Sequence, residues 1–149
     1  MVKGKVKESI VKSTISAIAI CIQVNLPFIL KDKPGTGKSK TIEAICRALT
    51  RHCITFIAGV HEPADIGGYP CVIDEKLQFL PAPFLRKAKE LADAGENVFI
   101  FADELTNAPP AMQGALMRLM LERQAGELDL NMPNISMGGA ANPPEQAAE

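Results

Sequence analysis

The chain has 149 residues, of which 47% are hydrophobic, so it can form one domain with a buried core but is too short for two ordinary domains. Its 16 basic and 17 acidic residues nearly cancel, which excludes a global basic field of the kind that attracts nucleic acid, although Lys3, Lys5, Lys7 and Lys12 make the first dozen residues locally positive. We therefore expect a single globular domain without a nucleic-acid partner.

The first predicted element is a helix. Apolar positions recur at helical spacing over about residues 8–23, which predicts one face packed on the core. These positions are Val11, Ile15, Ile18 and Ile22. The apolar stretch continues to residue 30, but Gln23, Asn25 and Pro27 interrupt it, so we expect a helix followed by a strand and no membrane anchor.

A glycine-rich stretch, Pro34-Gly-Thr-Gly-Lys-Ser39, follows the apolar run at residues 26–30 and leads into a second helical pattern. Strand, glycine turn and helix N-terminus together form a phosphate cradle, because backbone N–H groups turn inward and the helix dipole adds roughly half a positive charge. Lys38 can reach the β- and γ-phosphates, and Ser39 can hold Mg²⁺. The residues predicted to bind a nucleoside triphosphate are Pro34, Gly35, Thr36, Gly37, Lys38, Ser39 and Lys40.

One position departs from the phosphate-loop pattern G-x-x-x-x-G-K-[ST]. Asp32 stands where the pattern has its first glycine. An Asp can adopt a left-handed turn at some cost, but we expect its carboxylate near the phosphates, where it would weaken binding. A glycine turn that merely joins strand to helix is the simpler alternative; the flanking elements favour the phosphate site.

The middle of the chain alternates strand and helix patterns. A run of β-formers at residues 53–58 predicts a second, parallel strand, and residues 61–68 are expected to form a polar loop. Residues 71–80 predict a β-hairpin. Pro81 and Pro83 then start a helix that stops at Gly95.

A continuous apolar run at residues 98–102 predicts a fully buried strand that ends in Asp103-Glu104. Parallel α/β sheets bind ligands at this end of their strands. Asp103 can hold the Mg²⁺ water shell beside Ser39, and Glu104 can accept a proton from the water that attacks the γ-phosphate. The alternative is a plain helix start, since a helix begins soon after Asn107.

The last elements are a helix around residues 112–119, a short strand at 127–130 and a strand at 135–141. If the last strand lies beside the first, Asn142 emerges near the γ-phosphate, where its amide can orient the attacking water. The adjacent glycines Gly138 and Gly139 weaken this strand prediction.

Together these segments resemble the AAA+ ATPases of the MoxR type, from about residue 8 to the end. Beside the phosphate loop and the hairpin, the resemblance rests on Glu62-Pro-Ala-Asp-Ile-Gly67, on Phe101-Ala-Asp-Glu-Leu-Thr-Asn107 as the Walker B strand end and on Ala140-Ala-Asn-Pro-Pro-Glu145 as sensor 1. It implies an α/β fold, a three-layer P-loop NTPase (AAA+ core) with a parallel sheet. The units would be a leading helix (8–25), a phosphate-loop unit (26–58), a hairpin insert (71–80) and a unit from Walker B to sensor 1 (97–145).

The resemblance implies Mg²⁺-dependent ATP hydrolysis that drives protein remodelling or a chaperone-like activity. Lys38, Glu104 and Asn142 would be the catalytic residues, and Ser39 and Asp103 the metal ligands. The family works as a ring, commonly a hexamer, on protein clients. Its core continues past sensor 1 to a fifth strand, an arginine finger and a helical lid, so this chain resembles a partial domain without them, for which we expect slow turnover and an open sheet edge.

Two other functions compete with the ATPase. The chain could be a nucleotide-binding or interaction module with little or no hydrolysis, or a small-molecule kinase, although Glu104 and Asn142 fit water activation better. GTP is disfavoured because no Asn-Lys-x-Asp segment occurs. Without a secretory leader pattern or C-x-x-C spacing among its 4 cysteines, we expect the protein in the cytoplasm.

Overall fold

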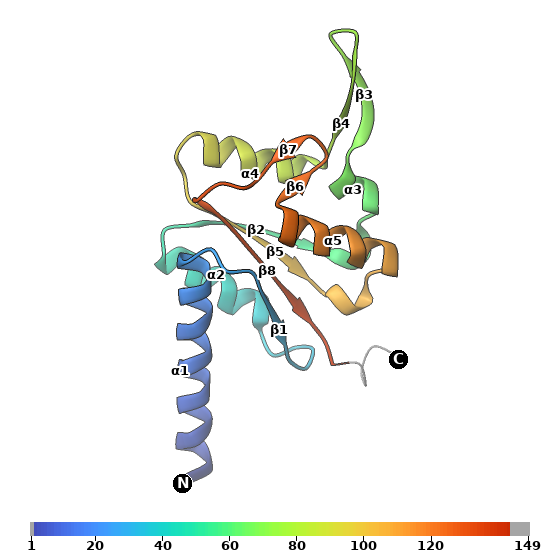
Figure 1. Ribbon diagram of the computed structural model, residues 1–149. Coiled ribbons are helices and arrows are strands. Elements are labelled where there is room, and N and C mark those ends of the chain that lie inside the picture. Colours follow the sequence, from blue (N-terminus) through green and yellow to red (C-terminus); the bar gives the residue numbers. More distant parts are fainter. Residues whose placement is uncertain (1, 144–149) are drawn as a thin grey trace.

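The protein, described here by a computed structural model over residues 2–143, has three layers, with a parallel sheet between two layers of helices (Figure 1). The sheet has four strands in the order β1-β8-β5-β2. Their bounds are Phe28–Lys31 for β1, His52–Ile57 for β2, Val98–Asp103 for β5 and Ile135–Ala141 for β8. All neighbouring pairs are parallel, as the sequence predicts, and the phosphate-loop strand β1 lies at one edge.

Helices connect these strands and cover both faces of the sheet. The helices are α1 (Val2–Gln23), α2 (Lys38–Ala48), α3 (Pro63–Gly67), α4 (Pro83–Asp93) and α5 (Pro110–Glu122). Short 3-10 turns follow β2 and β5: η1 (Ala58–Val60) and η2 (Leu105–Asn107). Two antiparallel pairs complete the fold: β3 (Tyr69–Ile73) with β4 (Lys76–Leu80), and β6 (Gln124–Ala125) with β7 (Leu128–Asp129).

The core is split by the sheet into two clusters, and β5 contributes to both. Phe99 and Phe101 point to the side covered by α1 and α2, whereas Val98 and Ile100 point to the side of α4 and α5. Successive side chains of a strand alternate between faces, and both faces of β5 are covered. This is why β5 is apolar without interruption from Val98 to Ala102.

The glycines of β8 do not interrupt the strand, contrary to the weakness that the sequence suggested. A Cβ at Gly138 would lie 2.9 Å from the Phe28 ring and 3.0 Å from the Phe99 ring. A Cβ at Gly139 would lie 2.6 Å from the Leu105 side chain. The two glycines therefore make room for residues of the neighbouring strands and of η2.

We expect Gly138→Ala to lower the free energy of unfolding by about 1–3 kcal/mol, because the added methyl group must displace packed aromatic rings. Urea unfolding followed by circular dichroism measures this. Gly114→Ala in α5 is the matched control, since a Cβ there meets nothing within 4 Å and alanine favours a helix. Equal stability of the two variants would contradict the packing role of Gly138.

Two sequence predictions need correction. The segment at residues 61–68 is not only a loop: it contains α3, whose start is fixed by a capping box between Glu62 and Asp65. The leading helix begins at Val2 rather than near residue 8, and between residues 7 and 23 only its last part is covered. Ile18 and Ile22 are buried, but Val11 is 56% exposed because α1 extends beyond the sheet.

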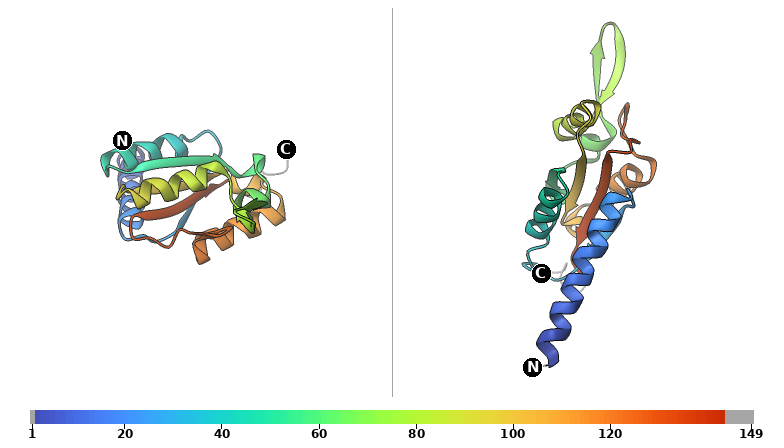
Figure 2. Two further views of the ribbon diagram at one scale, coloured as in Figure 1. Left: turned by 90° about the horizontal axis from the view of Figure 1, so that it is seen from above. Right: turned by 90° about the vertical axis from the view of Figure 1, so that its left-hand side faces the viewer.

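The hairpin predicted at residues 71–80 is present as β3 and β4, and it stands out from the body (Figure 2). Its two-residue turn, Asp74-Glu75, has φ of 49° and 61°, the left-handed conformation that tight hairpins require. In the right-hand view of Figure 2 the hairpin lies at the top, and α1 extends downward in the opposite direction. Among the described residues, no helix is long and apolar enough to cross a membrane.

Candidate functional site

The loop between β1 and α2 has the backbone of a phosphate cradle. Gly35 and Gly37 have φ of 76° and 79°, a region that side chains disfavour, so the turn requires glycine at both positions. Gly37 precedes α2 without a side-chain cap, which leaves the first N–H groups of the helix free to bind an anion.

Lys38 folds back over this loop. Its Nζ donates to the backbone oxygens of Asp32 and Lys33, both at 2.9 Å, and to Asn142 Oδ1 at 3.3 Å. The ammonium group therefore lies between the loop and the end of β8. A phosphate bound in the loop would meet a cation whose position is already set by these contacts.

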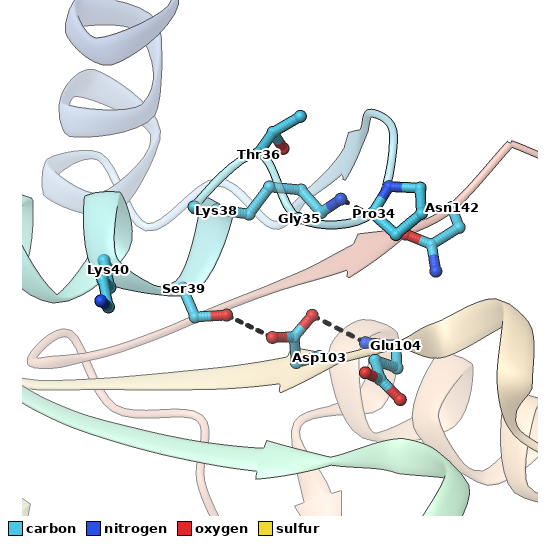
Figure 3. A pocket seen from close by; sticks show the side chains of 10 residues that line it. Pro34, Gly35, Thr36, Lys38, Ser39, Lys40, Asp103, Glu104 and Asn142 are labelled. Carbon is cyan, nitrogen blue, oxygen red and sulfur yellow. Dashed lines mark hydrogen bonds between the residues drawn. The ribbon is translucent and has the colours of Figure 1, made fainter.

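The ends of α2 and β5 meet at Ser39 and Asp103. Ser39 Oγ donates a hydrogen bond to Asp103 Oδ2, and Asp103 Oδ1 accepts the Glu104 N–H at 2.8 Å (Figure 3). A hydroxyl and a carboxylate in direct contact are hard oxygen ligands within reach of one ion. This donor set fits Mg²⁺.

Glu104 directly follows β5 in a left-handed conformation, with φ of 56°. Its side chain is exposed, and its Oε2 accepts a hydrogen bond from Asn107 Nδ2 at 3.3 Å. The sequence places Asn107 at a helix start and at the end of the Walker B segment, and predicts no role of its own for it. Nothing in its spacing indicated this contact with Glu104.

Asn142 directly follows β8, as the strand prediction required. Its side chain faces Lys38, and its backbone N–H donates to Thr106 Oγ1 in η2 at 3.1 Å. Thr106 is a second residue that sequence reasoning missed, because it meets Asn142 only through the pairing of distant strands.

All the predicted site residues line one open pocket of about 410 Å³. They are Pro34, Gly35, Thr36, Gly37, Lys38, Ser39, Lys40, Asp103, Glu104 and Asn142. Three strand ends supply them, and the strands are parallel, so their carboxyl ends lie at the same edge of the sheet. The roles of these residues in chemistry stay predictions.

Asp32 lies differently from the expectation for it. Asp32 lines a groove on the α1 side of the loop and is not among the residues that line the phosphate pocket. Asp32 Oδ1 accepts the Lys33 N–H at 2.7 Å, and this bond is the main reason why the pKa of the Asp32 carboxyl is lowered from its ordinary value. The residue is also absent from the positive-φ positions, so it supports the loop without a left-handed turn.

The groove beside Asp32 adjoins the phosphate pocket and has a volume of about 380 Å³. Thr36 and Lys38 line both. Its remaining wall is mostly apolar and comes from α1 and β1, with the side chains Ile10, Val11, Ile15, Ile18 and Leu30. The apolar groove and the phosphate pocket thus share two lining residues and lie side by side.

Comparisons with known proteins give a matching family and similar folds. The family described as AAA domain (dynein-related subfamily) matches residues 27–134. A candidate ATPase from Cytophaga hutchinsonii has a similar structure, with 24% identity and a TM-score of 0.55 over 91% of this chain and 39% of that one. NtrX from Brucella abortus is similar with 16% identity and a TM-score of 0.58 over 93% of this chain and 31% of that one.

These structural likenesses concern the fold alone. The chain spans 39% of the Cytophaga protein and 31% of NtrX, so both of those proteins are much longer than the shared region. No curated protein matches the sequence.

Proposed function

Since this chain belongs to the AAA domain family, dynein-related subfamily, we propose that it binds ATP with Mg²⁺ and hydrolyses the ATP to ADP and inorganic phosphate. The observation that carries the proposal is the single pocket in which the phosphate loop, Asp103, Glu104 and Asn142 meet. The Ser39–Asp103 contact in that pocket supports a metal ion between them. Bound Mg²⁺ would neutralise charge on the phosphate oxygens.

In the proposed reaction, water attacks the γ-phosphorus while the bond from that phosphorus to the bridging oxygen breaks, giving ADP and inorganic phosphate. Glu104 accepts the proton of the attacking water, and the Asn142 amide orients that water. Lys38 and the loop N–H groups hold the phosphates. The hydrogen bond from Asn107 orients the Glu104 carboxylate.

The apolar groove beside the phosphate pocket is the proposed place for the nucleobase. The flat faces of a nucleobase can pack against apolar side chains, and Thr36 of the loop lines both the groove and the phosphate pocket. The absence of an Asn-Lys-x-Asp segment from the sequence supports ATP over GTP.

Within the family we propose the MoxR type, with remodelling of a protein client by a ring of subunits in the cytoplasm. The hairpin inserted before α4 supports this assignment and is the proposed contact for the client. Val72 and Leu77 pair across the hairpin, and their exposed fractions are 75% and 60%. Exposed apolar side chains next to each other on a projecting element favour contact with a partner. The same exposed hairpin supports the second candidate, an interaction module with little or no hydrolysis.

Phosphate release from ATP separates the two candidates. We expect the purified chain to release inorganic phosphate in the presence of ATP and Mg²⁺, and to lose this activity when EDTA removes the metal. Calorimetry with Mg·ATP shows whether nucleotide binds at all. Saturable binding without phosphate release would favour the interaction module, and no binding would contradict both the ATPase and a nucleotide-dependent module.

A further inference from the structure

The turn η2 connects β5 to α5 and passes beside the end of β8. Its middle residue, Thr106, is half-buried, and its Oγ1 accepts the hydrogen bond from the Asn142 N–H at 3.1 Å. Thr106 does not line the phosphate pocket; it lines a separate apolar cavity on the other side of the turn. Any effect of Thr106 on bound nucleotide must therefore pass through another residue.

The Asn142 N–H has no strand partner in the sheet. The β1–β8 ladder ends with the pair Lys31 and Ala141, and the β5–β8 ladder ends with Ala102 and Gly139. Asn142 lies beyond both ladder ends and is half-buried. A backbone N–H in such a place needs an acceptor, and the Thr106 hydroxyl supplies it.

The hydrogen bond fixes the backbone from which the Asn142 side chain projects. That side chain accepts from Lys38 Nζ at 3.3 Å across the pocket. If the backbone were released, the amide would have a range of directions relative to the loop. Misplacement of a catalytic group, here the Asn142 amide, by about 1 Å is enough to lower the rate of the catalysed reaction strongly.

We propose that Thr106 is a positioning residue, which sets the direction of the Asn142 amide for the attacking water. The inference rests on the proposed ATPase function and adds to it a residue outside the nucleotide pocket. Binding of Mg·ATP depends on the loop and Lys38, so Thr106 should affect turnover far more than affinity.

The test compares Thr106→Val, which keeps the shape and removes the acceptor, with Thr106→Ser, which keeps the acceptor. Thr55→Val is the matched control, because Thr55 is exposed on β2 and its Oγ1 lies 3.5 Å from Cys53 Sγ rather than at the pocket. The two readouts are the hydrogen-exchange rate of the Asn142 amide by NMR and the kcat and KM for ATP.

We expect Thr106→Val to raise the exchange rate and to lower kcat, each by about tenfold, the factor that corresponds to one lost hydrogen bond. KM should stay within about threefold. Thr106→Ser and Thr55→Val should behave as the wild type in both readouts.

An unchanged kcat in Thr106→Val, or an equal loss of kcat in Thr106→Ser, would overturn the proposal while leaving the ATPase function in place. Unchanged amide exchange in Thr106→Val would also overturn it, because the hydrogen bond would then not hold Asn142. A wild-type chain that hydrolyses no ATP would overturn the proposed function, and this inference with it.

Discussion

Replacing Glu104 by Gln is expected to lower the rate of ATP hydrolysis by about 10²–10⁴-fold while Mg·ATP still binds. Glutamine keeps the size of the side chain and an oxygen that can accept the bond from Asn107, which is 3.3 Å long in the wild type. It has no carboxylate to take a proton from water. Phosphate release measures the rate, and calorimetry measures the affinity for Mg·ATP.

The matched control for this variant is Glu75→Gln. Glu75 belongs to the other Asp-Glu pair of the chain, in the hairpin turn, and does not line the phosphate pocket. Its replacement should leave the hydrolysis rate unchanged. A Glu104→Gln variant that hydrolyses ATP as fast as the wild type would show that Glu104 is not the base.

Replacing Lys38 by Ala should weaken Mg·ATP binding by about 10- to 150-fold, since charge-assisted hydrogen bonds contribute about 1.5–3 kcal/mol. Lys38 is the cation that bridges the loop and the end of β8, through contacts of 2.9 and 3.3 Å. The variant removes both the charge and this bridge. Calorimetric titration with Mg·ATP measures the change.

Lys87→Ala provides the control, because Lys87 lies on α4 and pairs with Glu90 at 3.3 Å, away from the pocket. It should bind nucleotide as the wild type does. If the Lys38→Ala variant bound Mg·ATP as tightly as the wild type, Lys38 would not bind the phosphates. Circular dichroism of both variants shows whether each is folded.

Much of the sheet and the loop could be predicted because their signals are local. The apolar run of β5 reports burial on both faces, and the two glycines of the phosphate loop report backbone conformations that other residues disfavour. Such constraints act within a few residues, so the sequence carries them directly. The order of the strands in the sheet is not among these local signals, because it depends on pairing between segments far apart in the chain.

Other features depend on contacts that no local pattern contains. The periodicity of α1 shows which face is apolar, but not that the helix continues past its partners and leaves Val11 exposed. The five-residue helix α3 is too short for periodicity; its only signals were Pro63 after Glu62 and the acidic Asp65 near the start. The pairing of Thr106 with Asn142 depends on the register of strands far apart in the chain.

The register of β1 also has a consequence for how the protein is made. Among the strands that the structure describes, β1 pairs only with β8, so Phe28 finds its neighbour at Gly138. During synthesis β1 cannot form its pairing with β8 until residues 135–141 have left the ribosome. Late, long-range pairing of this kind is slow and exposes strand edges to other chains. A nascent chain that stops before β8 therefore has the loop sequence but lacks both the strand that pairs with β1 and Asn142 at its end.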